Sequence, residues 1–145
     1  MKKQKIIIAD NNKYFREGLK RILLNIGNVK IIGEVENGLQ LLELLENEKA
    51  DIVFLDVAMT GMGGFEATLI GHRKFPNIRF IAFSSLENQR YINKMITAGV
   101  SGYLAKSNDN YDLLHEIVNS KEERFYLSPG LQTVNLRFDN HSLVN

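Results

Sequence analysis

The sequence predicts an α/β fold in which a five-stranded parallel sheet is covered by helices on both faces. Short apolar runs alternate with stretches of helical periodicity through most of the 145 residues. Most of these runs lack the polar alternation of a half-exposed strand, as expected for parallel strands that are buried on both sides. A chain of this length is also long enough for one domain with a core of its own.

Taken in order, the apolar runs at residues 6–9, 30–35, 52–55, 80–83 and 102–105 are the predicted strands. The run at 30–35 is more mixed in polarity than the others, which favours a position at an edge of the sheet. Apolar residues recur at helical spacing within residues 15–26, 41–45, 91–96 and 113–118, and residues 65–74, before Pro76, supply the remaining helix. Each predicted strand is therefore followed by one helix.

The alternation of strands and helices stops near residue 124, so we expect one domain over residues 1–124. Residues 125–145 contain Pro129, Gly130 and scattered polar residues, which are typical of a C-terminal tail or the start of a linker. This stretch is too short to hold a DNA-binding domain with its own core.

Composition excludes several classes of protein. Eighteen Lys and Arg against seventeen Asp and Glu give a net charge of +1, which is too balanced for nucleic-acid binding by this chain alone. The absence of cysteine excludes disulfides, thiolate metal sites and a thiol nucleophile, and it fits a reducing compartment. The apolar stretch near the N-terminus is interrupted by Asp10, so it is neither a signal peptide nor a membrane span. We therefore expect a cytoplasmic protein without membrane partners.

Polar side chains follow four of the predicted strands. Asp10 and Asn11 follow the first strand, Asp56 the third, Ser84 the fourth and Lys106 the fifth. In an open parallel sheet the carboxyl ends of the strands form the ligand-binding edge, so these side chains are expected to converge. Carboxylates are ligands that Mg²⁺ prefers, and a lysine supplies a point charge for phosphate oxygens. The pattern suits a divalent cation and an anion together.

Each of these residues also has a simpler interpretation. Asp10 and Asn11 are residue types that cap helices, Ser84 is suited to satisfying backbone groups at a strand end, and Lys106 to a solvated surface position. Asp56 is more informative, because a carboxylate after a buried strand is costly unless it is hydrated, paired or metal-bound. The joint placement of the five residues favours a functional site.

Four segments resemble the signature blocks of response-regulator receiver domains in order and spacing. They are IIIADNN, IVFLDVAMTGMGGFEA, IAFSS and AGVSGYLAKS, and the resemblance covers about residues 5 to 120. The segments IADNNKYFREGL, HRKFPNI and YLSP are similar to receivers of the subfamily that carries helix-turn-helix output domains. The resemblance implies a flavodoxin-like, doubly wound sheet with strand order 2-1-3-4-5. It also implies a signalling module of a two-component system, not an enzyme, whose partners are a sensor histidine kinase or phosphotransfer protein and, in a homodimer, a second copy.

Carried over by position, the resemblance makes Asp56 the phosphoacceptor, which acts as the nucleophile toward a phosphodonor. It implies a Mg²⁺ ion held by Asp10, Asn11, Asp56 and the backbone carbonyl of Ala58. It gives Lys106 the role of a cation that contacts a phosphoryl oxygen.

The resemblance also implies a switch. Ser84 would move to form a hydrogen bond with the phosphoryl group, and Tyr103 would follow into the space that Ser84 leaves. A change of this kind transmits a signal only if phosphate stabilises the two conformations differently.

Three positions depart from the family pattern. Asn11 stands where the family usually has a second acid, Thr60 where it has proline, and Gly63 where it commonly has aspartate. The loss of one unit charge near 4 Å from a cation costs roughly 1 to 4 kcal/mol between water-like and surface dielectric limits. We therefore expect weak Mg²⁺ binding. Thr60 and Gly63 are expected to loosen the loop after Asp56.

Two further positions bear on the lifetime of an aspartyl phosphate. In the receiver family, the residues two positions beyond the phosphoacceptor and two beyond the switch hydroxyl flank the path of the attacking water. Here they are Ala58 and Leu86, neither of which has a side chain that orients water. Slow self-dephosphorylation is the expected result.

Two other functions compete with this interpretation. One is a pseudo-receiver, an interaction module of the same fold that phosphorylation does not control, and Asn11 is the observation in its favour. The other is a nucleotide-binding enzyme, but GMGGFE lacks the third glycine of a dinucleotide fingerprint and LAKS lacks the upstream glycine of a P-loop.

Overall fold

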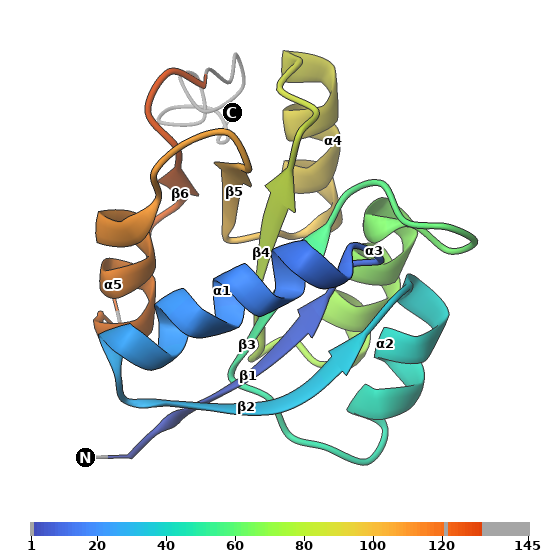
Figure 1. Cartoon of the computed structure of the whole chain (residues 1–145). Helices are drawn as coiled ribbons and strands as arrows, with labels where there is room; N and C mark the ends of the chain where they lie inside the picture. Colours follow the sequence, from blue (N-terminus) through green and yellow to red (C-terminus); the bar gives the residue numbers. More distant parts are fainter. Residues whose placement is uncertain (1, 121, 132–145) are drawn as a thin grey trace.

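The computed structural model of the chain describes residues 2–120 and 122–131, in which strands and helices alternate (Figure 1). The elements are β1 (Gln4–Ala9), α1 (Lys13–Ile26), β2 (Val29–Val35), α2 (Gly38–Leu45), β3 (Ile52–Asp56), α3 (Gly64–Lys74), β4 (Arg79–Ser84), α4 (Gln89–Ala98), β5 (Gly102–Ala105), α5 (Tyr111–Asn119) and β6 (Tyr126–Leu127). Among these described residues, no helix combines the length and apolar character that a membrane crossing requires.

The sheet has the strand order β2-β1-β3-β4-β5-β6, and every pair of neighbouring strands is parallel. The predicted order of the first five strands is confirmed, and β2 lies at an edge. The chain runs from β1 to the outer strand β2 and then crosses to β3 on the other side of β1. The winding direction therefore reverses between β1 and β3, which is where ligands bind in open α/β sheets.

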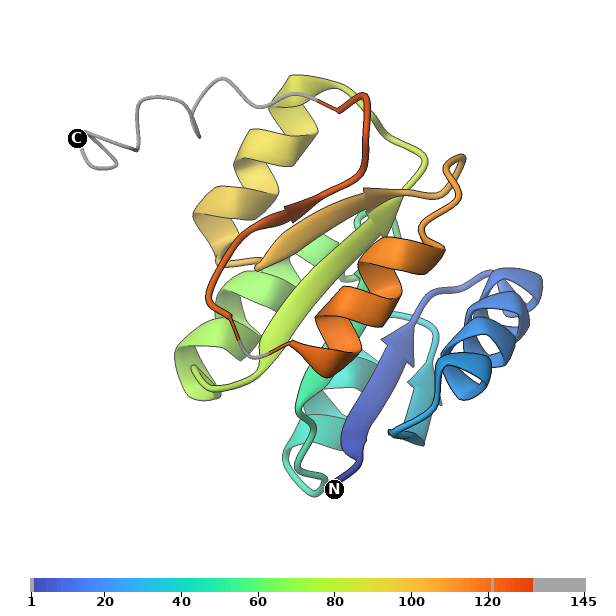
Figure 2. The ribbon, with the colours of Figure 1, turned by 90° about the vertical axis from the view of Figure 1, so that its left-hand side faces the viewer.

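Helices cover both faces of the sheet, α1 and α5 on one face and α2, α3 and α4 on the other (Figure 2). Alternate residues of each strand serve the two layers, because successive side chains of a strand point to opposite faces. In β1, Ile6 and Ile8 belong to the core layer that contains Leu23 of α1, and Ile7 belongs to the layer that contains Leu41 of α2. Burial on both faces explains the lack of alternation in the sequence.

A sixth strand was not predicted. Tyr126 and Leu127 pair with Gly102 and Tyr103 of β5, and the Tyr126 side chain is fully buried. This strand lies in the stretch that the sequence indicated as a tail or linker. Two paired residues are too few to show a period, so only the contact with β5 defines the strand. The rest of that stretch, residues 132–145, lies outside the described residues.

The start of α3 packs directly on the end of β3. The Gly64 N–H donates to the Val57 carbonyl at 2.8 Å. A Cβ atom at Gly64 would lie 2.4 Å from the Asp56 carbonyl oxygen, closer than any side chain allows. A residue without a side chain is therefore needed here, and it holds the loop after Asp56 against its strand.

Candidate functional site

The ammonium of Lys106 joins two buried carboxylates at the carboxyl end of the sheet. Its Nζ lies 2.7 Å from Asp10 Oδ2 and 3.3 Å from Asp56 Oδ2. Asp10 and Asp56 follow or end the adjacent strands β1 and β3, and their exposed fractions are 1% and 8%. Lys106 follows β5, so the structure brings together residues from three strands. The interpretation of Lys106 as a solvated surface lysine is wrong.

The Lys106 ammonium also lies over an aromatic ring. Its Nζ is 4.2 Å from the centroid of Phe15, in the first turn of α1. Phe15 packs edge-on against Phe83 of β4, with the ring centroids 5.1 Å apart. A cation over a ring face gains electrostatic attraction from the ring. Phe15 was predicted only as an apolar residue of its helix, and it forms one wall of the site.

Asn12, and not Asp10 or Asn11, caps α1. The Asn12 side chain accepts hydrogen bonds from the Tyr14 and Phe15 N–H groups. One Asp10 oxygen, Oδ1, accepts from the Asn12 N–H at 2.8 Å. The other, Oδ2, is buried without a hydrogen bond and is held by the ion pair with Lys106. Asp10 therefore keeps one oxygen directed into the site.

Two of the departures from the family pattern contact each other. Asn11 Nδ2 donates to Thr60 Oγ1 at 3.5 Å, and both residues are exposed. The amide nitrogen of Asn11 is thus engaged across the loop after β3. The atom that Asn11 can offer to a cation is its amide oxygen.

Burial raises the pKa of the Asp56 carboxyl group above its ordinary value of 3.8. The positive charge of Lys106 lowers this pKa, and the negative charge of Asp10 raises it further. The Ala58 N–H donates to Asp56 Oδ1 at 3.3 Å and gives modest support to the charged form. Asp56 is an under-solvated carboxylate beside a second carboxylate, so a bound cation would stabilise it.

The donor set of this site fits Mg²⁺. Within residues 2–120 and 122–131 no three His, Cys, Asp or Glu side chains are gathered as metal ligands. Mg²⁺, however, usually takes only one or two carboxylates and completes its shell with waters and phosphate. Asp10 and Asp56 meet that requirement, and Asp10 Oδ2, which is paired with Lys106 and has no hydrogen bond, could serve as a ligand if it exchanged the Lys106 ammonium for the ion.

Ser84 and Tyr103 meet at the segment that follows β4. The Ser84 hydroxyl is buried and accepts from the Leu86 N–H at 2.9 Å. Tyr103 is fully buried, and its hydroxyl donates to the Leu86 carbonyl oxygen. Burial also raises the pKa of Tyr103. Both side chains therefore hold Leu86, one through its N–H and one through its carbonyl.

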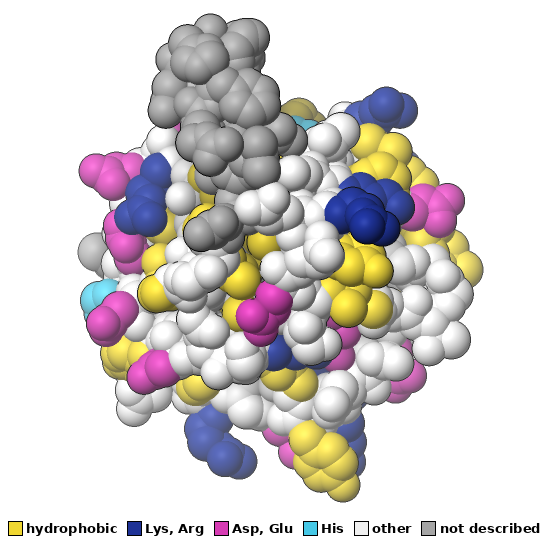
Figure 3. Space-filling model, turned by 90° about the horizontal axis from the view of Figure 1, so that it is seen from above, with side chains coloured by type: hydrophobic (Ala, Val, Ile, Leu, Met, Phe, Trp, Pro, Cys, Tyr) yellow, Lys and Arg dark blue, Asp and Glu magenta, His cyan; other side chains and the backbone are white. Residues whose placement is uncertain are grey.

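Ala58 and Leu86 line a cavity of about 320 Å³ beside the site, together with Phe65, Tyr91 and Lys94. Lys94 of α4 lies over the ring of Phe65 in α3, 4.6 Å from its centroid. The view onto this end of the molecule shows acidic, basic and hydrophobic side chains interspersed on the visible surface (Figure 3). The cavity itself is lined by one acidic side chain, Glu66, and one basic side chain, Lys94, so neither charge dominates it.

Sequence reasoning missed two buried polar residues near Lys106. They are Asn110, at the start of α5, and Ser128, which follows β6. Ser128 belongs to the YLSP segment, so a sequence signal existed. The YLSP segment indicated the subfamily of receivers with helix-turn-helix output domains, but it did not indicate which residues Ser128 contacts.

Comparisons with known proteins agree with the geometry. A model of the response regulator receiver domain matches residues 6–118. The transcriptional regulatory protein DegU of Brevibacillus brevis is 30% identical over 143 residues, which cover 99% of this chain and 60% of DegU. The response regulator GacA of Pseudomonas syringae is 29% identical over 127 residues, which cover 88% of this chain and 59% of GacA. The chain thus spans about 60% of the length of these curated relatives.

A solved structure of similar shape is a two-component response regulator of the LuxR family from Aurantimonas. It superposes with a TM-score of 0.81 and 27% sequence identity over 88% of this chain and 91% of that one. The predicted likeness to receivers of regulators with helix-turn-helix output domains is thereby confirmed, since the relatives are regulators of the DegU and LuxR type.

Proposed function

The chain belongs to the response regulator receiver domain family, and from this premise we propose that it accepts a phosphoryl group on Asp56 and passes the change to a partner surface. One observation carries the proposal: Asp56 and Asp10 lie on either side of the Lys106 ammonium at the point where the winding of the sheet reverses. This arrangement supports the proposal, because a carboxylate that can act as a nucleophile, a second anion and a cation would all be within reach of one phosphoryl group.

In the proposed transfer, a carboxylate oxygen of Asp56 attacks the phosphorus of the donor. A bond forms between that oxygen and phosphorus, and the bond from phosphorus to the donor's leaving group breaks. Lys106 leaves its contact with Asp56 and pairs with a phosphoryl oxygen, where it stabilises the charge of the transferring group. Phe15 limits the directions open to the Lys106 ammonium.

Asp10, Asn11, Asp56 and the backbone carbonyl of Ala58 are the groups that would hold Mg²⁺. When bound, the ion supplies positive charge next to the phosphoryl oxygens. Asp10 contributes a full charge and Asn11 only a dipole, so we expect weaker binding than at a site with two acids before the helix. The absence of hydrogen-bonding side chains at Ala58 and Leu86 favours slow loss of the phosphoryl group.

For the switch, we propose that Ser84 exchanges its bond with the Leu86 N–H for one with the phosphoryl group. The backbone of Leu86, in the segment between β4 and α4, then loses the hydrogen bond to Ser84 and keeps the one from the Tyr103 hydroxyl. Tyr103 therefore moves together with this segment. The change would reach the surface through α4, which follows this segment.

The expected partners are a sensor histidine kinase or phosphotransfer protein, and a second copy of the chain in a homodimer. DegU is named as a transcriptional regulatory protein, and this chain covers 60% of its length. We propose that it controls transcription through an output domain or partner, in the cytoplasm, without itself contacting nucleic acid. The near-neutral net charge supports the last point.

The alternative function is a pseudo-receiver that is regulated by binding alone. The observation that favours it is Asn11 itself, which places a neutral amide at the position of the usual second acid.

The deciding experiment is incubation with acetyl phosphate and Mg²⁺, followed by a phosphate-affinity gel. We expect a shifted band for the native chain and none for Asp56→Asn. Asp51→Asn is the matched control, because Asp51 stands just before β3, at its opposite end, and accepts from the Lys5 N–H there. It should shift like the native chain. A native chain that never shifts would favour the pseudo-receiver.

A further inference from the structure

Two side chains from residues further along the chain form hydrogen bonds with the backbone N–H and carbonyl groups of Ala105, the last residue of β5. The Ala105 N–H donates to Ser128 Oγ at 2.9 Å, and the Ala105 carbonyl accepts from Asn110 Nδ2 at 2.8 Å. Ser128 Oγ donates to Asn110 Oδ1 at 2.6 Å, which closes a ring of hydrogen bonds. Ser128 is 1% and Asn110 7% exposed, so water cannot readily replace a lost bond.

This ring lies directly before Lys106 in the chain. The Lys106 N–H donates to the Ser84 carbonyl at 2.9 Å, so β4 supports the Lys106 backbone from one side. Ser128 supports Ala105 from the other side, since β5 lies between β4 and β6. The backbone at Ala105 and Lys106 sets the point and direction from which the lysine side chain reaches Asp10 and Asp56.

The segment that carries Ser128 is fixed along its length. The Ser128 N–H donates to the Tyr103 carbonyl at 3.3 Å, and Asn108 Nδ2 donates to the Pro129 carbonyl at 2.9 Å. Leu127 pairs with Tyr103 in the sheet. The segment therefore holds β5 and the loop that leads to α5. It lies outside residues 6–118, the part that matches the receiver family.

We propose that Ser128 is a positioning residue of the phosphorylation site. Together with Asn110 it fixes Ala105, and Ala105 fixes the start of the Lys106 side chain. The side-chain hydrogen bonds of Ser128 go to Ala105 and Asn110, so its effect on phosphoryl transfer passes through Lys106. This inference rests on the proposed function, in which Lys106 contacts a phosphoryl oxygen.

The first test is a double-mutant cycle on the rate of phosphorylation by acetyl phosphate with Mg²⁺. A misplacement of about 1 Å at a reacting group costs on the order of 100-fold in rate, so partial relaxation of Ala105 in Ser128→Ala should cost roughly 10-fold. In the Lys106→Met background the same change should cost nothing further. Equal losses in both backgrounds, or no loss in either, would overturn the proposal.

Two further variants test whether the effect requires the hydroxyl group at position 128. Ser128→Thr keeps a hydroxyl and should recover most of the rate. Ser120→Ala removes a hydroxyl that accepts from the Glu122 N–H at 3.1 Å, away from Lys106, and should leave the rate unchanged. If Ser128→Ala melts below the assay temperature, Ser128→Cys takes its place, because it keeps the volume and weakens the hydrogen bonds.

The second test does not depend on phosphorylation. Amide hydrogen exchange, followed by NMR, should be faster at Ala105 and Lys106 in Ser128→Ala and unchanged in β1. If the native chain takes no phosphate, the proposed function fails, and faster exchange at these two amides still supports the positioning of Lys106. Unchanged exchange at both amides would overturn the positioning role whether or not the chain is phosphorylated.

Discussion

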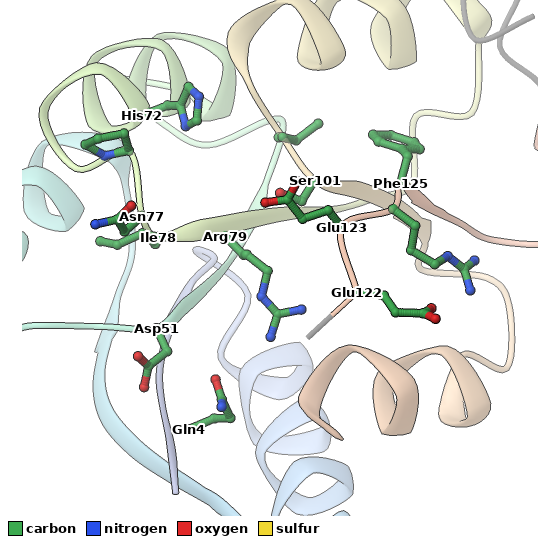
Figure 4. A pocket seen from close by; sticks show the side chains of 13 residues that line it. Gln4, Asp51, His72, Asn77, Ile78, Arg79, Ser101, Glu122, Glu123 and Phe125 are labelled. Atoms are coloured by element: carbon green, nitrogen blue, oxygen red, sulfur yellow. The ribbon is translucent and has the colours of Figure 1, made fainter. Parts of the chain in front are cut away.

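The two ends of the sheet hold similar charged groups in opposite arrangements. At the carboxyl end, the Lys106 ammonium contacts the buried carboxylates of Asp10 and Asp56. At the amino end, Arg79 extends into an open cavity of about 700 Å³ between Asp51 and Glu122 (Figure 4). The carboxylates around Arg79, those of Asp51, Glu122 and Glu123, line an open cavity, whereas Asp10 and Asp56 both contact the Lys106 ammonium directly.

The direction of the helices explains the difference. Each helix after a strand begins at the carboxyl end of the sheet, where its free N–H groups carry partial positive charge, and ends near the amino end, where carbonyl oxygens remain free. Arg79 Nη2 donates to one of these, the Ile117 carbonyl in the last turn of α5, at 2.8 Å. Burial lowers the pKa of Arg79. Arg79 therefore stabilises the end of a helix at the amino end of the sheet, whereas Lys106 contacts two carboxylates at the carboxyl end.

The largest effect should come from exchanging the cations at the two ends for methionine. We expect Lys106→Met to slow phosphorylation by acetyl phosphate by about 100- to 1,000-fold, as for loss of one preorganised charge contact. Arg79→Met should keep the rate and lose about 1 to 3 kcal/mol of unfolding free energy, because the Ile117 carbonyl loses its donor. Gel-based rates and urea unfolding measure the two quantities. A large rate loss in Arg79→Met would remove the distinction between the two ends.

Next in size is the return of a second acid at position 11. Asn11→Asp should tighten Mg²⁺ binding by about 1 to 4 kcal/mol, which is at least roughly fivefold in affinity. Calorimetric titration with MgCl₂ measures it. Asn77→Asp, at the amino end, is the matched control and should not change the affinity. Equal affinities of the native chain and Asn11→Asp would place position 11 outside the metal shell.

A smaller effect concerns stability and pH. Because burial raises the pKa of Asp56 above 3.8, the folded chain binds this proton more tightly than the unfolded chain does. Folding stability therefore falls as the pH rises from 3.8 through the raised pKa, and the loss is complete above it. In buffer at pH 7 that contains a chelator to remove divalent cations, Asp56→Asn should melt a few degrees higher than the native chain, because it has no buried charge at this position. The difference should vanish below pH 3.8, where Asp56 is protonated in both states.

Asp51→Asn is the counterpart at the amino end. Asp51 Oδ2 accepts from the Lys5 N–H at 2.8 Å, so its replacement should give no gain in melting temperature. Equal gains in the two variants would show that the stability cost is not particular to the phosphorylation site.

The smallest effect is on the lifetime of the phosphorylated form. Ala58→Asn or Leu86→Glu supplies a side chain that orients water, and either should speed dephosphorylation by several-fold. Loss of the shifted band after removal of acetyl phosphate measures the rate. A half-life of seconds in the native chain, unaltered by either substitution, would contradict the idea.

The two ends also differ in how far the sequence predicted them. The strands and the polar residues after them were predicted because apolar runs are local signals and parallel strands bring their carboxyl ends to one edge. The ring of Phe15 beneath Lys106 was not, because the packing of α1 on the sheet decides it. The cavity around Arg79 and the bonds of Ser128 depend on where residues 122–131 return to the sheet, and no local pattern records that.

The short strand β6 has a further consequence, for how the protein behaves at high concentration. It covers the outer side of β5, where Tyr126 and Leu127 pair with Gly102 and Tyr103 and the Ser128 side chain takes the Ala105 N–H. An uncovered strand edge is a template on which other chains can add strands. A chain shortened to the residues that match the family would expose the Tyr103 and Ala105 edge of β5 and become prone to edge-to-edge aggregation.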